Sequence, residues 1–258
     1  MEQKEAEDLA HDLLAQHAQK EPFTSLKDRL PALDDAYDVQ KAYVTELLAQ
    51  AGGPVAGYKI GLPTKKLQAM SGIDEPVAGV VLGKRVFKSG AVLSVGNYGH
   101  LGLDSELCIV VDQELMPDCS RTDIEWRLRS IHAAFEVIDD RGADYARLDA
   151  ASLVADNGWN AGVVLGPPGK ASVDLHNLNA KLTTNEKHFD IGATGDALGH
   201  PLDLVVWLVR HLARRGERLK AGQMVMTGSV FASKFPKAGD IYTFEIAGVP
   251  PVAVGIKA

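Results

Sequence analysis

The stretch Asp104-Ser-Glu-Leu-Cys-Ile-Val-Val111 places two acidic residues at the start of an apolar run. Side chains two positions apart in an extended strand share a face. Asp104 and Glu106 are therefore expected on one side of the strand, while Leu107 and Ile109 pack into an apolar core. The pattern predicts a buried strand that carries an acid-x-acid pair.

A further acid among apolar residues follows in Phe135-Glu-Val-Ile-Asp-Asp140. Buried carboxylates are costly without a counter-charge, and oxygen ligands suit magnesium, manganese or calcium. Glu136 could therefore join the acid pair around one cation, with a helix expected over Asp123 to Ala134 as the bridge. Two alternatives stay open here. The acid pair could be a solvated strand edge, and Asp139-Asp140-Arg141 could be a turn with a surface ion pair.

Outside this region the hydrophobic pattern predicts helices followed by a strand-rich body. One helix is expected over residues 2 to 19, and a second from Asp34 or Asp35 to Gly52-Gly53. A third is expected from Pro201 to Gly216. Short apolar runs, expected as strands, occur at residues 55–60, 107–111, 153–155, 163–165, 224–226, 241–246 and 252–256. We therefore expect an α+β fold, with residues 1–53 as a helical lead-in and residues 54–258 as a mostly antiparallel β body.

The overall composition excludes several classes of protein. The 258 residues are 46% hydrophobic and 24% charged, which is ordinary for a globular chain. A formal net charge of −7 opposes a basic face for nucleic acid or for an anionic membrane. Two cysteines are too few for a disulfide scaffold, and no apolar run is long enough to span a bilayer. We expect a cytoplasmic protein that acts on a small molecule.

Three further positions could contact a ligand. Lys59 lies in Gly57-Tyr-Lys-Ile-Gly61, on the strand face opposite Tyr58 and Ile60. It could pair with a substrate carboxylate or transfer a proton, although a solvated lysine is the alternative. The segments Asp156-Asn157-Gly158 and Thr227-Gly228-Ser229 could present amide, hydroxyl or backbone N–H groups to an anion, or could be ordinary turns.

These signals belong to a set of motifs whose order along the chain resembles that of one family. The motifs are Gly57-Tyr-Lys-Ile-Gly-Leu62, Gly72-Ile-Asp-Glu-Pro76, Asp104-Ser-Glu106, Phe135-Glu-Val-Ile-Asp139, Val154-Ala-Asp-Asn157, Leu198-Gly-His-Pro201 and Ala221-Gly-Gln-Met-Val-Met-Thr-Gly228. From the region of residue 35 to the C-terminus, the chain resembles the hydratase/decarboxylase branch of the fumarylacetoacetate hydrolase superfamily.

The resemblance implies a mixed, mostly antiparallel β-roll with a small N-terminal helical part. It also implies a Mg²⁺ or Mn²⁺ ion held by three carboxylates, which match Asp104, Glu106 and Glu136, and a catalytic lysine that matches Lys59. The chain departs from the family where Asp104 replaces a glutamate. It also departs at Val77, where many hydratases have an aspartate, and at Gly158-Trp159, where small residues are usual.

The activity implied is a metal-dependent hydratase of aromatic catabolism, which adds water to a 2-hydroxy-2,4-dienoate to give a 4-hydroxy-2-oxo acid. Asp74 is the candidate that assists water addition. The residues expected to bind the substrate are Leu62, Asn157, Thr227 and Ser229. A decarboxylase of a 2-oxo-3-enedioate is the alternative, which Val77 favours, and carbon–carbon bond hydrolysis in an acylpyruvate is a third.

A different class of function is a partner subunit that has lost catalysis, with Asp104 and Val77 as the signs of that loss. The resemblance further implies a homo-oligomer, with an enzyme of the same pathway as a second possible partner.

Overall fold

The computed structural model describes residues 1–51, 53–171, 174–195 and 199–258. Its centre is a pair of long antiparallel strands, β5 (Leu101–Val111) and β6 (Leu128–Asp139), whose register runs from Leu101 opposite Asp139 to Val111 opposite Leu128. The acidic stretch quoted above lies in the first of them. This pair therefore decides which side chains of the two strands face one another.

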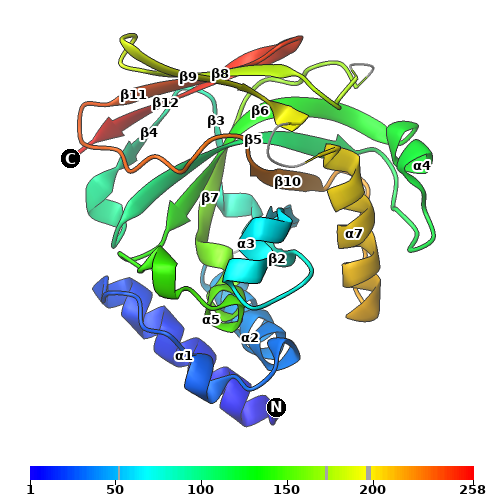
Figure 1. Cartoon of the computed structure of the whole chain (residues 1–258). Helices are drawn as coiled ribbons and strands as arrows, with labels where there is room; N and C mark the ends of the chain where they lie inside the picture. Colours follow the sequence, from blue (N-terminus) through cyan, green and yellow to red (C-terminus); the bar gives the residue numbers. More distant parts are fainter. Residues whose placement is uncertain (52, 172–173, 196–198) are drawn as a thin grey trace.

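Two mixed sheets form the β body, which lies at the top of Figure 1 above the helices α1, α2 and α5. The seven-stranded sheet has the order β2 (Val77–Leu82), β1 (Val55–Gly61), β10 (Met224–Ser229), β5, β6, β7 (Asn160–Leu165) and β3 (Val86–Lys88). The five-stranded sheet has the order β4 (Ala91–Ser94), β12 (Val249–Lys257), β11 (Ile241–Ile246), β8 (Asn179–Thr184) and β9 (His188–Ala193).

Three strand pairs are parallel, namely β1 with β10, β3 with β7 and β4 with β12, and the other described pairs are antiparallel. A mixed, mostly antiparallel β-roll body is therefore confirmed.

The main hydrophobic core contains side chains from both sheets and from α7 (Pro201–Arg214). Leu107 and Ile109 of β5 enter it, as the alternation of the sequence predicts. Phe135 of β6 packs beside Phe244 of β11, with ring centroids 6.1 Å apart. Burial of such large side chains contributes about 1.5–3 kcal/mol each, so these contacts hold the two sheets together.

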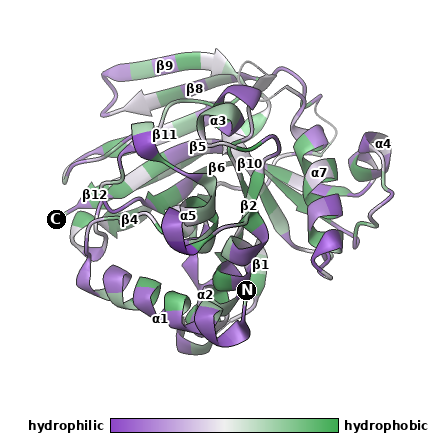
Figure 2. Cartoon of the chain, turned by 60° about the horizontal axis from the view of Figure 1, so that its bottom comes forward, coloured by the Kyte–Doolittle hydropathy of each residue, from purple (hydrophilic) through white to green (hydrophobic). Residues whose placement is uncertain are grey.

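The N-terminal helices form a second hydrophobic cluster. Helix α1 (Gln3–Gln19) packs on α2 (Leu33–Ala51), and the cluster also takes in α5 (Ala150–Ala155) and residues of β2. Figure 2 shows hydrophilic and hydrophobic segments alternating along α1, as expected for an amphipathic helix that packs through one face. Both expected helices are confirmed, while the division between residues 53 and 54 stays a prediction.

The helix expected over Asp123 to Ala134 is wrong for most of its length. Helix α4 covers only Arg121–Glu125, and the chain enters β6 at Leu128. From Ile131 onward the strand is buried on both faces, so apolar residues lose the alternation that identifies a strand, and a helical spacing arises by coincidence. The run at residues 153–155 is likewise helical and belongs to α5.

Several short elements were not anticipated. Helix α3 (Lys65–Met70) begins after Thr64, whose side chain accepts a hydrogen bond from the Leu67 N–H. The 3₁₀ turns cover Lys27–Arg29, Gly83–Arg85, Val95–Asn97, Tyr145–Arg147 and Asn157–Trp159. Strands β2, β3, β4, β8 and β9 are also additional. None of the helices within the described ranges is long and apolar enough to cross a bilayer.

The helix expected from Pro201 to Gly216 is confirmed as α7, although Leu198 of the motif before it lies outside the described residues. His211 on this helix is 5% exposed, stacks on Trp207 with centroids 5.0 Å apart, and its Nδ1 has no hydrogen-bond partner. Burial, followed by the charges of Arg214 and Arg215, lowers the pKa of His211 to about 4. The folded protein therefore holds this imidazole neutral well below its ordinary pKa of 6.5.

We predict a loss of stability in acid that comes from His211. Below pH 6.5, His211 binds a proton in the unfolded chain, whereas in the folded chain it stays unprotonated down to about pH 4. The free energy of unfolding should therefore fall by about 1.4 kcal/mol per pH unit across this window. His211→Phe keeps an aromatic ring against Trp207 but cannot take up a proton. In urea melts, the fall in the free energy of unfolding between pH 7 and pH 4 should be smaller in this variant by about 3 kcal/mol. Parallel curves for the two proteins would contradict the prediction.

Candidate active site

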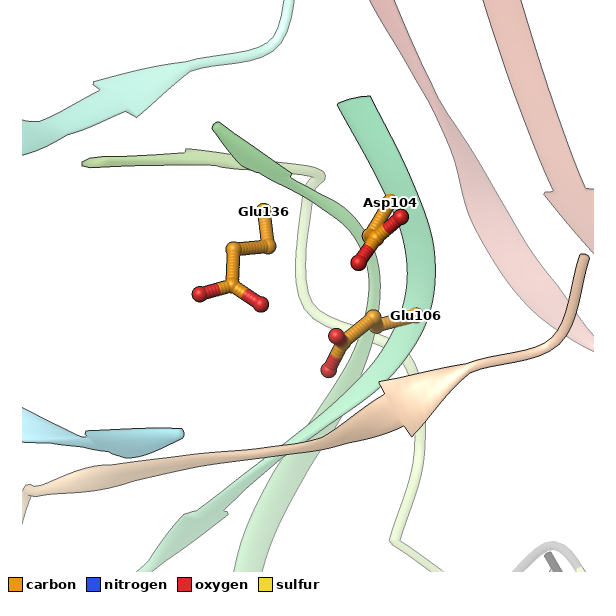
Figure 3. A group of neighbouring side chains, drawn as sticks. All are labelled: Asp104, Glu106 and Glu136. Atoms are coloured by element: carbon orange, nitrogen blue, oxygen red, sulfur yellow. The ribbon is translucent and has the colours of Figure 1, made fainter. Parts of the chain in front are cut away.

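Three carboxylates from the two central strands converge at one point. Asp104 and Glu106 share a face of β5, and Glu136 of β6 lies directly opposite Asp104 in the register. One carboxylate oxygen from each lies within 4.8 Å of the others, and Figure 3 shows Glu136 facing the pair across the gap. The antiparallel pairing of β5 with β6 brings them together, so the expected helical bridge between the two acidic sites is wrong.

The cluster is buried and electrostatically unbalanced. Oδ1 of Asp104 is buried without a hydrogen-bond partner, and Oε2 of Glu136 has none beyond its ion pair with Lys59. Burial, together with the charge of Glu136, raises the pKa of Asp104 to about 6. The same two causes raise the pKa of Glu106 well above its ordinary value. Three converging carboxylates with few donors around them suit Mg²⁺ or Mn²⁺, which take oxygen ligands. The residues present therefore fit a divalent ion, and the alternative of a solvated edge does not hold.

Lys59 of β1 supplies the cation nearest to this cluster. Its side chain is 8% exposed, and its Nζ lies 3.4 Å from Oε2 of Glu136. Nζ also donates a hydrogen bond to the Gly158 carbonyl at 3.1 Å. Burial acts to lower the pKa of this ammonium, but the charges of Glu136, Glu106 and Asp104 outweigh burial and raise it. Lys59 is therefore a buried ammonium, and the alternative of a solvated lysine is wrong.

Glycines surround the Lys59 side chain. A Cβ at Gly158 would lie 3.3 Å from Nζ, and a Cβ at Gly61 would lie 3.5 Å from it. At Gly79 a Cβ would lie 2.7 Å from the Asn157 carbonyl oxygen and 3.0 Å from Cγ of Lys59. The neighbouring glycines were expected to let another group approach closely. That group is the Lys59 side chain itself, which occupies the space that the missing Cβ atoms leave.

We predict that Gly79→Ala displaces Lys59. Because the new Cβ meets the backbone of Asn157, the loop or the lysine must shift, at a cost of about 1–3 kcal/mol in the free energy of unfolding. Misplacement of a reacting group by 1 Å can lower a rate about a hundredfold, so turnover should fall by tenfold or more. Gly96→Ala is the matched control, since its Cβ would come no nearer than 3.5 Å to another residue's heavy atom. Equal turnover in the two variants would contradict the prediction.

Asn157 shapes the loop beside Lys59. Its side chain accepts from the Val80 N–H at 2.7 Å and donates to the Val80 carbonyl at 2.9 Å, as a neighbouring strand would. Asn157, Gly158 and Trp159 all have positive φ, of 50°, 61° and 59°. This left-handed run is unfavourable for residues with a Cβ, and it turns the Gly158 carbonyl toward Lys59. Both polar ends of the Asn157 side chain are thus used by β2, which opposes the expected contact with a substrate.

A cavity of about 490 Å³ opens beside the carboxylates and Lys59. The other residues that line it are mostly apolar: Ile60, Gly61, Leu62, Pro63, Thr64, Leu67, Met70, Ser71, Ile138, Tyr145, Leu148, Leu153, Gly158, Trp159, Gly228, Ser229, Phe231, Ala232, Ser233 and Phe235. Three carboxylates and an ammonium beside an apolar chamber are suited to a small anionic ligand with an apolar portion.

The remaining expected site residues divide into two groups. Leu62 and Ser229 line the cavity, where the Ser229 hydroxyl donates to the Phe231 carbonyl at 2.7 Å. Thr227 is completely buried and donates to the Leu107 carbonyl at 2.9 Å, and Asp74 is exposed. Neither Thr227 nor Asp74 is among the described residues that line the cavity. The structure therefore opposes the substrate-binding role of Thr227 and the catalytic role of Asp74.

The segment Asp139-Asp140-Arg141 is not a surface turn, because all three residues are buried. Nη2 of Arg141 contacts Oδ2 of Asp156 at 2.7 Å, and the Asp139 carboxylate accepts from the backbone N–H of His100 at 2.8 Å. Sequence reasoning also missed Tyr145, Trp159 and Phe235 at the cavity. Only Trp159 carried a signal, as a bulky residue where small ones are usual.

Comparison with known proteins identifies relatives of this arrangement. Residues 132–257 match the family described as "Fumarylacetoacetate (FAA) hydrolase C-terminal". The chain is 28% identical to 2-keto-4-pentenoate hydratase of Paraburkholderia xenovorans, across 98% of this chain and 95% of the relative. It is 30% identical to 2-oxo-hept-4-ene-1,7-dioate hydratase of Escherichia coli, across 94% and 96%. A solved structure of 4-oxalocrotonate decarboxylase from Pseudomonas putida G7, complexed with magnesium and adipate, is 26% identical, with a TM-score of 0.90 over 99% and 98% of the chains.

Proposed function

Because the chain belongs to the fumarylacetoacetate hydrolase family, we propose that it is a metal-dependent lyase that adds water to a 2-hydroxy-2,4-dienoate. The product is a 4-hydroxy-2-oxo acid. The observation that carries the proposal is the convergence of Asp104, Glu106 and Glu136 beside the buried Lys59 at an apolar cavity.

The three carboxylates are the residues that would hold Mg²⁺ or Mn²⁺. When bound, the ion acts as a Lewis acid that stabilises negative charge on the oxygen of a 2-oxo acid. Two observations support this choice, namely the unpaired Oδ1 of Asp104 within the carboxylate cluster and the magnesium in the solved decarboxylase relative. The shorter Asp104 still reaches the common point, since its oxygen lies within 4.8 Å of both others.

Lys59 binds and orients the substrate carboxylate, and it holds a proton at Nζ. Its ammonium faces the carboxylates from β1, and the Gly158 carbonyl fixes its direction. The apolar residues of the cavity exclude bulk water from the diene, which strengthens every charge interaction inside. Ser229 and Leu62 border the same space and are the two expected substrate-binding residues that remain candidates.

The charge of the cavity favours a monocarboxylate substrate. Lys59 is the single lysine or arginine among the described residues that line it. A substrate with a second carboxylate, such as a 2-oxo-3-enedioate, would bury that charge without a counter-ion, which is unfavourable. This opposes the decarboxylase. That alternative keeps its support from the decarboxylase structure and from the buried Val77. The intact carboxylates and lysine oppose a partner subunit without activity.

The test supplies the protein and Mg²⁺ with 2-hydroxypenta-2,4-dienoate and, separately, with 2-oxohex-3-enedioate. We expect a hydrated product from the first substrate, and no product after the metal is chelated. Carbon dioxide from the second substrate without hydration of the first would overturn the hydratase in favour of the decarboxylase. No product from either would overturn both. The homo-oligomer and the cytoplasmic location remain predictions, of which light scattering on the purified protein tests the first.

A further inference from the structure

A second buried acid lies near the cavity, apart from the three carboxylates. Asp140 is 1% exposed and accepts three hydrogen bonds. They come from the Tyr145 hydroxyl at 2.9 Å, the His100 ring nitrogen Nδ1 at 2.6 Å and the Gly142 backbone N–H at 2.9 Å. Three donors on one buried carboxylate hold it in a fixed orientation.

Tyr145 connects this carboxylate to the cavity. It is one of the lining residues and is 44% exposed, so it borders the cavity where solvent can enter. Its ring packs edge-on against Trp159 and Phe235, with centroids 5.6 and 6.4 Å apart, and both of these residues also line the cavity. His100 stacks on Phe235 at 4.6 Å and is itself partly exposed. A hydrogen-bonded chain thus runs from the cavity through Asp140 to solvent.

The hydroxyl of Tyr145 donates its hydrogen to Asp140. Burial and the negative charge of Asp140 raise the pKa of Tyr145, so the phenol is neutral. A phenol that donates its proton to a carboxylate keeps its lone pairs for another donor, and the carboxylate makes those lone pairs more basic. The polar group best suited to meet them is a donor such as water.

We propose that Tyr145, backed by Asp140, is the base that activates the water in the hydration step. The inference rests on the proposed function. As the water oxygen bonds to C4 of the 2-oxo-3-enoate, one O–H bond of the water breaks and its proton goes to Oη of Tyr145. The phenol proton passes to Oδ2 of Asp140, and the electron pair of C3=C4 moves toward the C2 oxygen. C3 then takes a proton from solvent water and Asp140 releases its proton to solvent, so that one water is added in total.

The test follows two steps of the reaction separately in the magnesium-loaded protein. Loss of the dienol absorbance reports ketonisation, and chromatography of the 4-hydroxy-2-oxo acid reports hydration. Tyr145→Phe keeps the ring contacts and removes Oη. We expect hydration to slow about a hundredfold, which is typical for loss of a general base, while ketonisation and the affinity for Mg²⁺ stay unchanged. Tyr58→Phe is the control, because it removes a hydroxyl–carboxylate bond of 3.0 Å to Glu217 outside the described cavity lining.

Asp140→Asn provides the second variant. The amide keeps the shape of the carboxylate but cannot take the phenol proton, so hydration should again fall about a hundredfold. Because the two residues act as a unit, the double variant should be no slower than either single variant. Hydration by Tyr145→Phe at the unaltered rate, or an equal loss of ketonisation and hydration, would overturn the inference and leave the proposed function standing. Failure of the unaltered protein to hydrate would overturn both.

Discussion

Glu106→Gln is expected to lower the affinity of the protein for Mg²⁺ by at least about a hundredfold, since even groups that only support a metal ligand contribute 10- to 100-fold. Glutamine is isosteric, and its amide oxygen can still accept the hydrogen bond that Glu106 receives from the Gly228 N–H at 2.8 Å. The substitution therefore removes one negative charge and little else. Turnover at limiting Mg²⁺ should fall about a thousandfold, equivalent to about 4 kcal/mol of lost charge stabilisation.

The same substitution should stabilise the protein when no metal is bound. Three buried carboxylates face one ammonium in the unaltered cluster, so removal of one negative charge relieves repulsion. We expect the metal-free variant to melt at a higher temperature than the metal-free parent, and Mg²⁺ to raise its melting temperature less. Isothermal titration with Mg²⁺ and thermal melts with and without chelator measure both effects. Glu114→Gln, an exposed site, is the control, and unchanged Mg²⁺ affinity in Glu106→Gln would exclude Glu106 as a ligand.

The acid-x-acid strand and the lysine strand could be predicted from the sequence because each follows a local rule. Alternation along one strand separates Asp104 and Glu106 from Leu107, and the same rule separates Lys59 from Tyr58. The position of Glu136 opposite Asp104 could not be predicted this way. It depends on the register of two strands, which the wrongly expected helix at Asp123 to Ala134 had concealed.

The polar residues around the site were harder to assign, because their hydrogen-bond and ion-pair partners depend on how the chain folds. Asn157 pairs with Val80, Arg141 with Asp156, and Tyr145 with Asp140, and none of these pairs follows from residue type. Asp74 was placed in the site by resemblance alone, and Asn157 by the resemblance together with its position in a polar segment after an apolar run. The structure shows that one serves the backbone of β2 and the other is exposed. Assigning roles to these side chains therefore required the three-dimensional structure, whereas the shared strand face of Asp104 and Glu106 could be predicted from the sequence.

Lys59→Met is expected to abolish turnover, by about a thousandfold or more, while preserving the affinity for Mg²⁺. Methionine fills the same space between the glycines but removes the ammonium that orients the substrate carboxylate. The three carboxylates all remain and lose their nearest positive charge, so their attraction for a divalent cation does not weaken. Lys59→Met and Glu106→Gln should thus both be inactive but differ in metal binding, which separates a residue that holds the substrate from one that holds the ion.

The two variants should also differ in stability without metal. Loss of one partner from a buried ion pair costs about 3–5 kcal/mol, because the opposite charge stays buried and unpaired. The metal-free Lys59→Met protein should therefore unfold at lower urea concentration than its parent, opposite to Glu106→Gln, and Mg²⁺ should restore more stability to it than to the parent. Lys181→Met is the matched control, since Lys181 forms a 3.8 Å pair with Glu245 at the surface, where such pairs contribute little. If Lys59→Met were as stable as its parent and bound Mg²⁺ poorly, Lys59 would have to act on the metal site rather than beside it.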